Sequence, residues 1–135
     1  MTDTSIQQVL VYLMVTMSAA DRTMTDRELA KIGTIVNSLP IFENYDPENL
    51  IEDSRKCTEF LQENDGLNGV FSLVMENVPK HLHETAYAVA VDVAAADLNV
   101  EQEELRVLQL LRSALNLDRL ACAAIERAAR ARHRT

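Results

Sequence analysis

The side chains best able to do chemistry are carboxylates that recur in two similar stretches of the chain. An Ala-Ala-Asp triplet ends at Asp21 and again at Asp97, and a glutamate follows seven residues after each aspartate. We name residues 19–28 the first elbow and residues 95–104 the second elbow. Carboxylate and amide oxygens are the ligands preferred by hard divalent cations such as Ca²⁺ and Mg²⁺. The candidate ligands of a divalent metal ion are Asp21 and Glu28 in the first elbow and Asp97, Asn99, Glu101 and Glu104 in the second.

The same residues can also have a purely structural role, and their spacing does not distinguish this role from metal binding. Asp97, Asn99 and Glu101 alternate like the opening of a calcium-binding loop, but the later glycine and glutamate of an EF-hand are absent. Each aspartate can instead accept hydrogen bonds from N–H groups of the turn and of the next helix, as a clasp. In the first elbow, Thr25 and Glu28 match a capping box, in which the two residues bond reciprocally at a helix start.

Both elbows belong to a longer duplication with an offset of 76 residues. The copies align without a gap, and the identical pairs are Val15/Val91, Ala19/Ala95, Ala20/Ala96, Asp21/Asp97, Glu28/Glu104 and Leu29/Leu105. A long period that occurs only twice is typical of a duplicated helical hairpin, because a solenoid needs more copies to bury its core. We expect the halves at roughly residues 5–40 and 80–116, in a pseudo-two-fold relation that would bring the carboxylates of the two elbows together.

The composition predicts an all-α fold packed through aliphatic side chains. Aromatic residues make up 4% of the 135 residues and apolar residues 47%, with three glycines and three prolines. Alanine and leucine are frequent and alternating β-branched patterns are scarce, which favours helices. The length suits one core, so we expect a single domain over residues 1–135.

Apolar periodicity and helix-end signals predict seven helices joined by short loops. Residues 5–20 are apolar on almost all sides, which indicates a central helix. A later helix is expected to open with Asp46 as N-cap and Pro47 at the first helical position. In the sixth helix the expected core positions are Leu105, Leu108, Leu111 and Leu115. In the last helix they are Leu117, Leu120, Ala121, Ala124, Ile125 and Ala128.

Charge separates an acidic body from a basic C-terminal segment. Residues 1–105 carry 19 acids and six bases, whereas residues 106–135 carry two acids and seven bases, for a net charge of −8. Because binding a duplex requires a basic face, we expect no nucleic-acid partner. We interpret the acidic run over residues 43–65 as a solvated helix face. The basic segment complements the last helix dipole, with an acidic partner or weak contact with anionic lipid headgroups as alternatives.

Other signals exclude several classes of protein. The chain has no glycine-rich phosphate loop, nucleophile elbow or Ser/His/Asp pattern, so we do not expect an enzyme. No apolar run is long enough for a transmembrane segment, and no secretion signal precedes the first helix, which predicts a cytoplasmic protein.

Isolated polar residues and thiols have structural interpretations. Cys57 and Cys122 are expected as buried, reduced thiols. His81 and His83 are two residues apart, which disfavours a zinc pair and favours surface or capping histidines. Asp92 lies in an apolar helix and either joins the elbow cluster, faces a water-filled groove or pairs with a base.

The two elbows and the seven-helix layout resemble the tellurite-resistance TerB family over residues 6–132. The resemblance implies a small bacterial cytoplasmic protein of stress responses, including responses to tellurite, with a proposed divalent-metal role for the elbow acids. A related domain is fused to a membrane-anchored J-domain co-chaperone, which implies an interaction module. Family elbows commonly carry glycine after the aspartate, where this chain has Arg22 and Leu98. The first elbow also has Thr23 and Thr25 at positions that are often acidic, so metal binding is better matched at the second elbow.

We therefore expect a non-enzymatic stress-response module whose elbows bind a divalent metal ion or a basic partner. The alternative is a purely structural protein–protein interaction domain without metal, either co-chaperone-like or a peripheral membrane adaptor. In both interpretations a protein partner is expected, and the sequence does not name it.

Overall fold

Seven α-helices make up most of the described part of the chain. The computed structural model describes residues 5–19, 24–63, 66–96 and 102–134, and in these ranges there is no β-strand. The α-helices are α1 (Ile6–Ala19), α2 (Asp26–Ser38), α3 (Asn49–Glu63), α4 (Gly66–Asn77), α5 (His83–Ala96), α6 (Gln102–Leu115) and α7 (Arg119–His133). Two short 3₁₀ helices, η1 (Pro40–Phe42) and η2 (Lys80–Leu82), precede α3 and α5. The predicted all-α class is confirmed.

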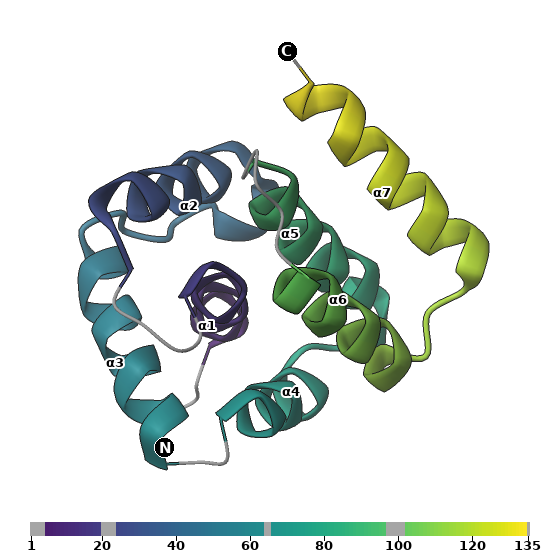
Figure 1. Cartoon of the computed structure of the whole chain (residues 1–135). Helices are drawn as coiled ribbons and strands as arrows, with labels where there is room; N and C mark the ends of the chain where they lie inside the picture. Colours follow the sequence, from purple (N-terminus) through teal and green to yellow (C-terminus); the bar gives the residue numbers. More distant parts are fainter. Residues whose placement is uncertain (1–4, 20–23, 64–65, 97–101, 135) are drawn as a thin grey trace.

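The first helix is the centre of the core, as its sequence predicts. Residues 9–15 of α1 are all buried, and α1 packs against α2, α3, α4 and α5. Figure 1 shows α1 end-on, with α2, α3 and α4 arranged around it. A helix that is apolar on every side can bury all its faces only in such a central position.

The fifth helix is the second organising element. Its small side chains, among them Ala86, Ala90 and Ala94, are buried and allow α1, α6 and α7 to pack closely on it. The last helix, α7, lies at the outer edge of the molecule and packs mainly on α5 (Figure 1). The pseudo-two-fold relation between residues 5–40 and 80–116, and the single domain over residues 1–135, stay predictions.

Local capping signals set several helix ends. Thr25 is the N-cap of α2, and Asp118 caps α7 by accepting a hydrogen bond from the N–H of Ala121 at 3.1 Å. Asn116 closes α6 in the left-handed conformation, with φ of 51°. Asparagine tolerates this region better than most residues, so it ends the helix with little strain.

The start of α3 differs from the prediction. The helix begins at Asn49, and Asp46 lies in a preceding turn, where its carboxylate accepts a hydrogen bond from the N–H of Glu48 at 2.9 Å. The N–H of Asn49 donates to the carbonyl of Asp46, and the N–H of Leu50 donates to that of Pro47. This three-residue spacing belongs to a turn, so the Asp-Pro pair forms an Asx-type turn ahead of the helix.

Two leucines that were expected in the core lie at the surface. Leu105 at the start of α6 is 51% exposed, and Leu120 at the start of α7 is 77% exposed. The predicted inward face of α7 was wrong in this part, because Leu120, Ala124 and Ala128 are exposed and its buried residues are Cys122 and Ala129. A helix that packs mainly on one neighbour buries only a narrow stripe, and here Leu120 lies outside that stripe.

Candidate functional site

Two of the six predicted metal ligands can be placed. Glu28 and Glu104 are each the third residue of the helix that follows their elbow, α2 and α6, and both are partly buried. Carboxylates in a first helical turn interact favourably with the positive end of the helix dipole. The other four candidates, Asp21, Asp97, Asn99 and Glu101, lie outside the described residues.

Glu28 has a structural role at the start of α2. Its Oε1 accepts a hydrogen bond from the N–H of Thr25 at 2.9 Å, and its own N–H donates to Oγ1 of Thr25 at 3.1 Å. These two bonds form the predicted capping box and satisfy N–H groups that a helix start otherwise leaves without partners. The carboxylate is therefore held in a fixed position next to the first elbow.

A lysine joins the helix after the first elbow to the helix before the second. Lys31 Nζ, one turn beyond Glu28 on α2, donates to the carbonyl oxygen of Ala96 at 2.8 Å. Ala96 is the last residue of α5, so the ammonium group lies at the negative end of that helix dipole. The equivalent position in the second copy is Val107, so the duplication does not repeat this bond.

The described residues alone do not form a metal-binding site. Within those residues no group of three or more histidine, cysteine, aspartate or glutamate side chains could hold a metal ion. Four of the six candidate ligands lie outside these residues. Metal binding at the elbows therefore stays a prediction.

The α5–α7 interface contains two polar connections. Tyr87 donates a hydrogen bond to Glu126 Oε2 at 2.5 Å, and Arg112 of α6 contacts the same oxygen at 3.3 Å. Burial and the bond to Glu126 raise the pKa of Tyr87, so its hydroxyl stays a donor. Further along, Asp92 pairs with Arg132 at 2.6 Å. Of the three predicted roles of Asp92, pairing with a base is the one that the described residues support.

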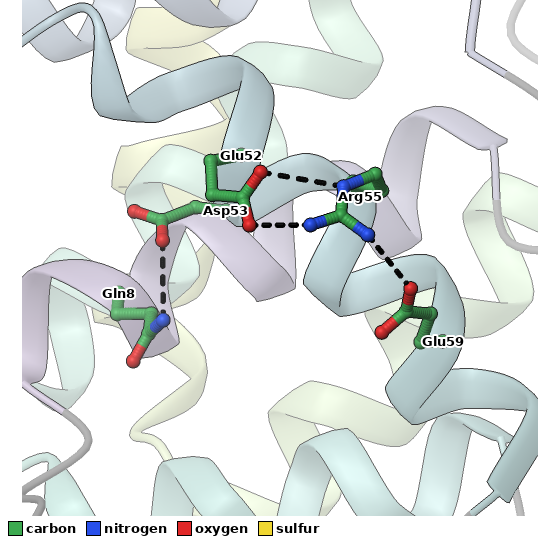
Figure 2. Close-up of polar contacts among 5 residues, drawn as sticks. All are labelled: Gln8, Glu52, Asp53, Arg55 and Glu59. Atoms are coloured by element: carbon green, nitrogen blue, oxygen red, sulfur yellow. Dashed lines mark hydrogen bonds and ion pairs between the residues drawn. The ribbon is translucent and has the colours of Figure 1, made fainter.

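A buried aspartate in the acidic run was missed by the sequence interpretation. Asp53 of α3 is 8% exposed, and it accepts hydrogen bonds from Gln8 Nε2 at 3.1 Å and from the Tyr45 hydroxyl at 2.6 Å. Figure 2 shows Asp53 pointing to Gln8 of α1, while the ion pairs of Arg55 with Glu52 and Glu59 lie along α3. The available signal was helical spacing, because Asp53 shares the buried face of α3.

Buried thiols and a buried histidine also have structural roles. Burial raises the pKa of the Cys57 thiol to about 12, and its Sγ donates to the carbonyl of Tyr12 at 3.5 Å. Burial likewise raises the pKa of Cys122, so neither thiol is activated, as predicted. The prediction for His83 was a surface or capping position, and the surface alternative is wrong. His83 is buried, with its Nε2 2.9 Å from the carbonyl of Val78.

Comparison with known proteins identifies one family. The family model described as "Tellurite resistance protein TerB" matches residues 7–129, which is nearly the whole chain. No curated protein and no solved structure gives a match. In the described ranges, no helix combines the length and the apolar character needed to cross a membrane.

Proposed function

The chain belongs to the TerB family, and from this membership we propose a cytoplasmic, non-enzymatic stress-response module whose elbow acids bind a divalent cation. The candidate ligands are Asp21 and Glu28 in the first elbow and Asp97, Asn99, Glu101 and Glu104 in the second. The observation that supports this most directly is the bond between Lys31 Nζ and the Ala96 carbonyl oxygen. It holds α2, which carries Glu28, against the end of α5, where the second elbow begins.

Electrostatics give a reason for a cation at the second elbow. Asp97 immediately follows the last residue of α5, where the helix dipole is negative and disfavours a carboxylate. Glu101, Glu103 and Glu104 add three more carboxylates in the next seven positions. Lys31 brings one positive charge to the end of α5. A divalent cation would offset the remaining repulsion, and the oxygen donors are of the type that Mg²⁺ and Ca²⁺ prefer.

The capping box supports a second candidate function, a structural interaction module without metal. Glu28 already bonds the N–H of Thr25, so the elbow acids would act as clasps that set the angle between successive helices. The working surface would then be another part of the molecule and its partner a protein, in a co-chaperone-like or peripheral membrane adaptor role. Exposed arginines of α7 would add weak contact with anionic headgroups.

Thermal unfolding with and without metal separates these two functions. The wild type and an Asp21→Ala/Asp97→Ala variant would be melted in chelator and then with Ca²⁺, Mg²⁺, Mn²⁺ or Zn²⁺. An ion site raises the melting temperature of the wild type with at least one metal, because binding to the folded state stabilises it, and does not raise that of the folded variant. No shift with any metal, together with a large loss of stability in the variant, favours the clasp.

A matched variant controls for the loss of negative charge. Glu63→Gln/Glu76→Gln removes two exposed acids that lie on α3 and α4 and outside the elbows. We expect it to keep the metal response of the wild type.

We also expect no hydrolysis of model phosphoesters by the metal-loaded protein, and metal-dependent turnover would contradict a non-enzymatic role.

A further inference from the structure

A groove of about 400 Å³ lies between α5, α6 and α7. Its apolar lining is Val91, Ala94, Ala95, Leu105 and Leu108, and its polar lining is Tyr87, Gln109, Arg112, Glu126 and Arg130. We infer that this groove binds a single-chain anionic amphiphile of the fatty-acid class, with the aliphatic chain on α5 and the acid group on Arg130. This inference is independent of metal binding at the elbows.

The floor and one wall of the groove are suited to an aliphatic chain. Ala94 and Ala95 have side chains too small to fill the space between α6 and α7, and Val91 and Leu108 complete an apolar surface. Leu105 is 51% exposed although its place in the duplication predicts a core position. An aliphatic ligand would remove this leucine from water, which is favourable in proportion to the apolar area covered.

The size of the groove favours a small molecule over a docked helix. Cavities that hold small ligands are typically about 300–1,000 Å³, mostly apolar and provided with a few polar groups. The lining residues Tyr87 and Ala95 are eight positions apart on α5, which corresponds to roughly 12 Å along the helix axis. An α-helix with its side chains is roughly 10–12 Å across. Even one or two turns of a docked helix would therefore need more volume than this groove offers.

The two charged residues that α7 contributes to the groove differ in their partners. Glu126 is bonded by both Tyr87 and Arg112, so its charge is already compensated. One turn further along α7, Arg130 is exposed and forms no ion pair with any residue in the described ranges. A guanidinium group binds a carboxylate through charge-assisted hydrogen bonds, which makes Arg130 the expected contact of the acid group.

The surrounding charge favours an anion over a cation. Residues 106–135 carry seven arginines and two acids, and both arginines of the groove come from this segment. The lining itself has two arginines and one glutamate, and this excess of one positive charge favours an anion over an ammonium group. An amphiphile of the same chain length with a cationic head group is therefore the appropriate negative control for binding of the anionic amphiphile.

Calorimetric titration of the whole protein with laurate and with dodecyltrimethylammonium, each below its micelle concentration, tests the inference. The two probes share one chain length and differ in the charge of the head. We expect saturable binding of laurate at one site, and binding of the cationic probe that is weaker by about tenfold or more, equivalent to one charge-assisted hydrogen bond. Absence of laurate binding, or equal binding of the two probes, would overturn the inference.

Three variants locate the site. Arg130→Gln should weaken laurate binding about tenfold and should strengthen the binding of the cationic probe, because one repelling positive charge is removed. Arg127→Gln is the matched control, because Arg127 is exposed on the same helix but does not line the groove. Ala95→Leu should reduce the binding of laurate by filling the floor, and far-ultraviolet circular dichroism would verify that it folds.

The pattern of losses distinguishes a specific groove from general electrostatic attraction. Equal losses in Arg130→Gln and Arg127→Gln would contradict a defined acid contact. Unchanged laurate affinity in a folded Ala95→Leu variant would show that the aliphatic chain of laurate does not lie in this groove, and would overturn the inference. Laurate binding that is unchanged in chelator would show that the groove does not require a metal ion at the elbows, whatever the result of the metal titration.

Discussion

Lys31 Nζ lies 2.8 Å from the carbonyl oxygen of Ala96, and this bond connects the helix after the first elbow to the helix before the second. The two residues are 65 positions apart in the chain. A cation at this point satisfies a terminal carbonyl of α5 and complements the negative end of its dipole. Lys31 therefore adds a side-chain hydrogen bond between the two copies of the duplication, which also pack on each other through α1 and α5.

Removing this amine should destabilise the protein without changing its fold. For Lys31→Met, which keeps the length of the side chain, we expect a loss of about 1 kcal/mol in the free energy of unfolding, the usual net value of a hydrogen bond. Urea denaturation followed by circular dichroism measures it. Lys56→Met is the control, because Lys56 is exposed on α3. Equal losses in the two variants would show that the bond to Ala96 adds nothing.

Substitutions at Glu28 can separate capping from metal binding. Glutamine also completes a capping box, so Glu28→Gln should keep the stability of the wild type in chelator while removing one carboxylate. Thr25→Ala should cost about 1 kcal/mol, because the N-cap acceptor is lost. If Glu28 is a metal ligand, Glu28→Gln should also reduce the metal-dependent rise in melting temperature. An unchanged rise would assign Glu28 to the cap alone.

The buried Asp53 should contribute to stability. In Asp53→Ala, the partly buried Tyr45 hydroxyl and Gln8 amide lose their acceptor, and we expect a loss of about 1 kcal/mol, towards the lower end of the cost of polar groups left without partners. The measurement is the midpoint and slope of urea unfolding. Glu52→Ala, in an exposed ion pair with Arg55 one position earlier, should have little effect. Similar effects of the two substitutions would contradict the role of Asp53 as a buried acceptor between α1 and α3.

Cys57 should react with thiol reagents only when the protein opens. Burial raises the pKa of its thiol from 9.0 to about 12, so at neutral pH the reactive thiolate is scarce and inaccessible. Labelling of a Cys122→Ala variant with a chromogenic disulfide should follow the rate of unfolding, and denaturant should accelerate it. Fast labelling in the absence of denaturant would show that Cys57 is not enclosed by α1 and α3.

The same shift predicts how alkaline pH affects stability. Because the pKa of Cys57 is higher in the folded state, its contribution to stability is complete below pH 9 and is lost as the pH rises towards about 12. Burial also raises the pKa of Tyr12, from 10.0 to about 12, which acts in the same direction. The melting temperature should therefore fall above pH 9, and a Cys57→Ala variant should show a smaller fall.

Several features of the fold could be predicted because they depend on neighbouring residues. The capping box at Thr25 and Glu28 follows from the few residues around it. The central position of α1 follows from apolar residues on all its sides. The two elbows, read with the helix pattern, also led to the TerB family, which the family model confirms.

The amino-acid sequence thus sufficed for the helical class, most helix ends, the duplication and the family, because these properties arise from local propensity and periodicity. The tertiary structure was needed to place Asp53 inside, Leu105 outside and Lys31 against Ala96. An apolar or charged residue on a helix can face several neighbours, and only the packing of distant helices selects one. For this reason the groove beside α7 follows from how α5, α6 and α7 pack and not from any motif.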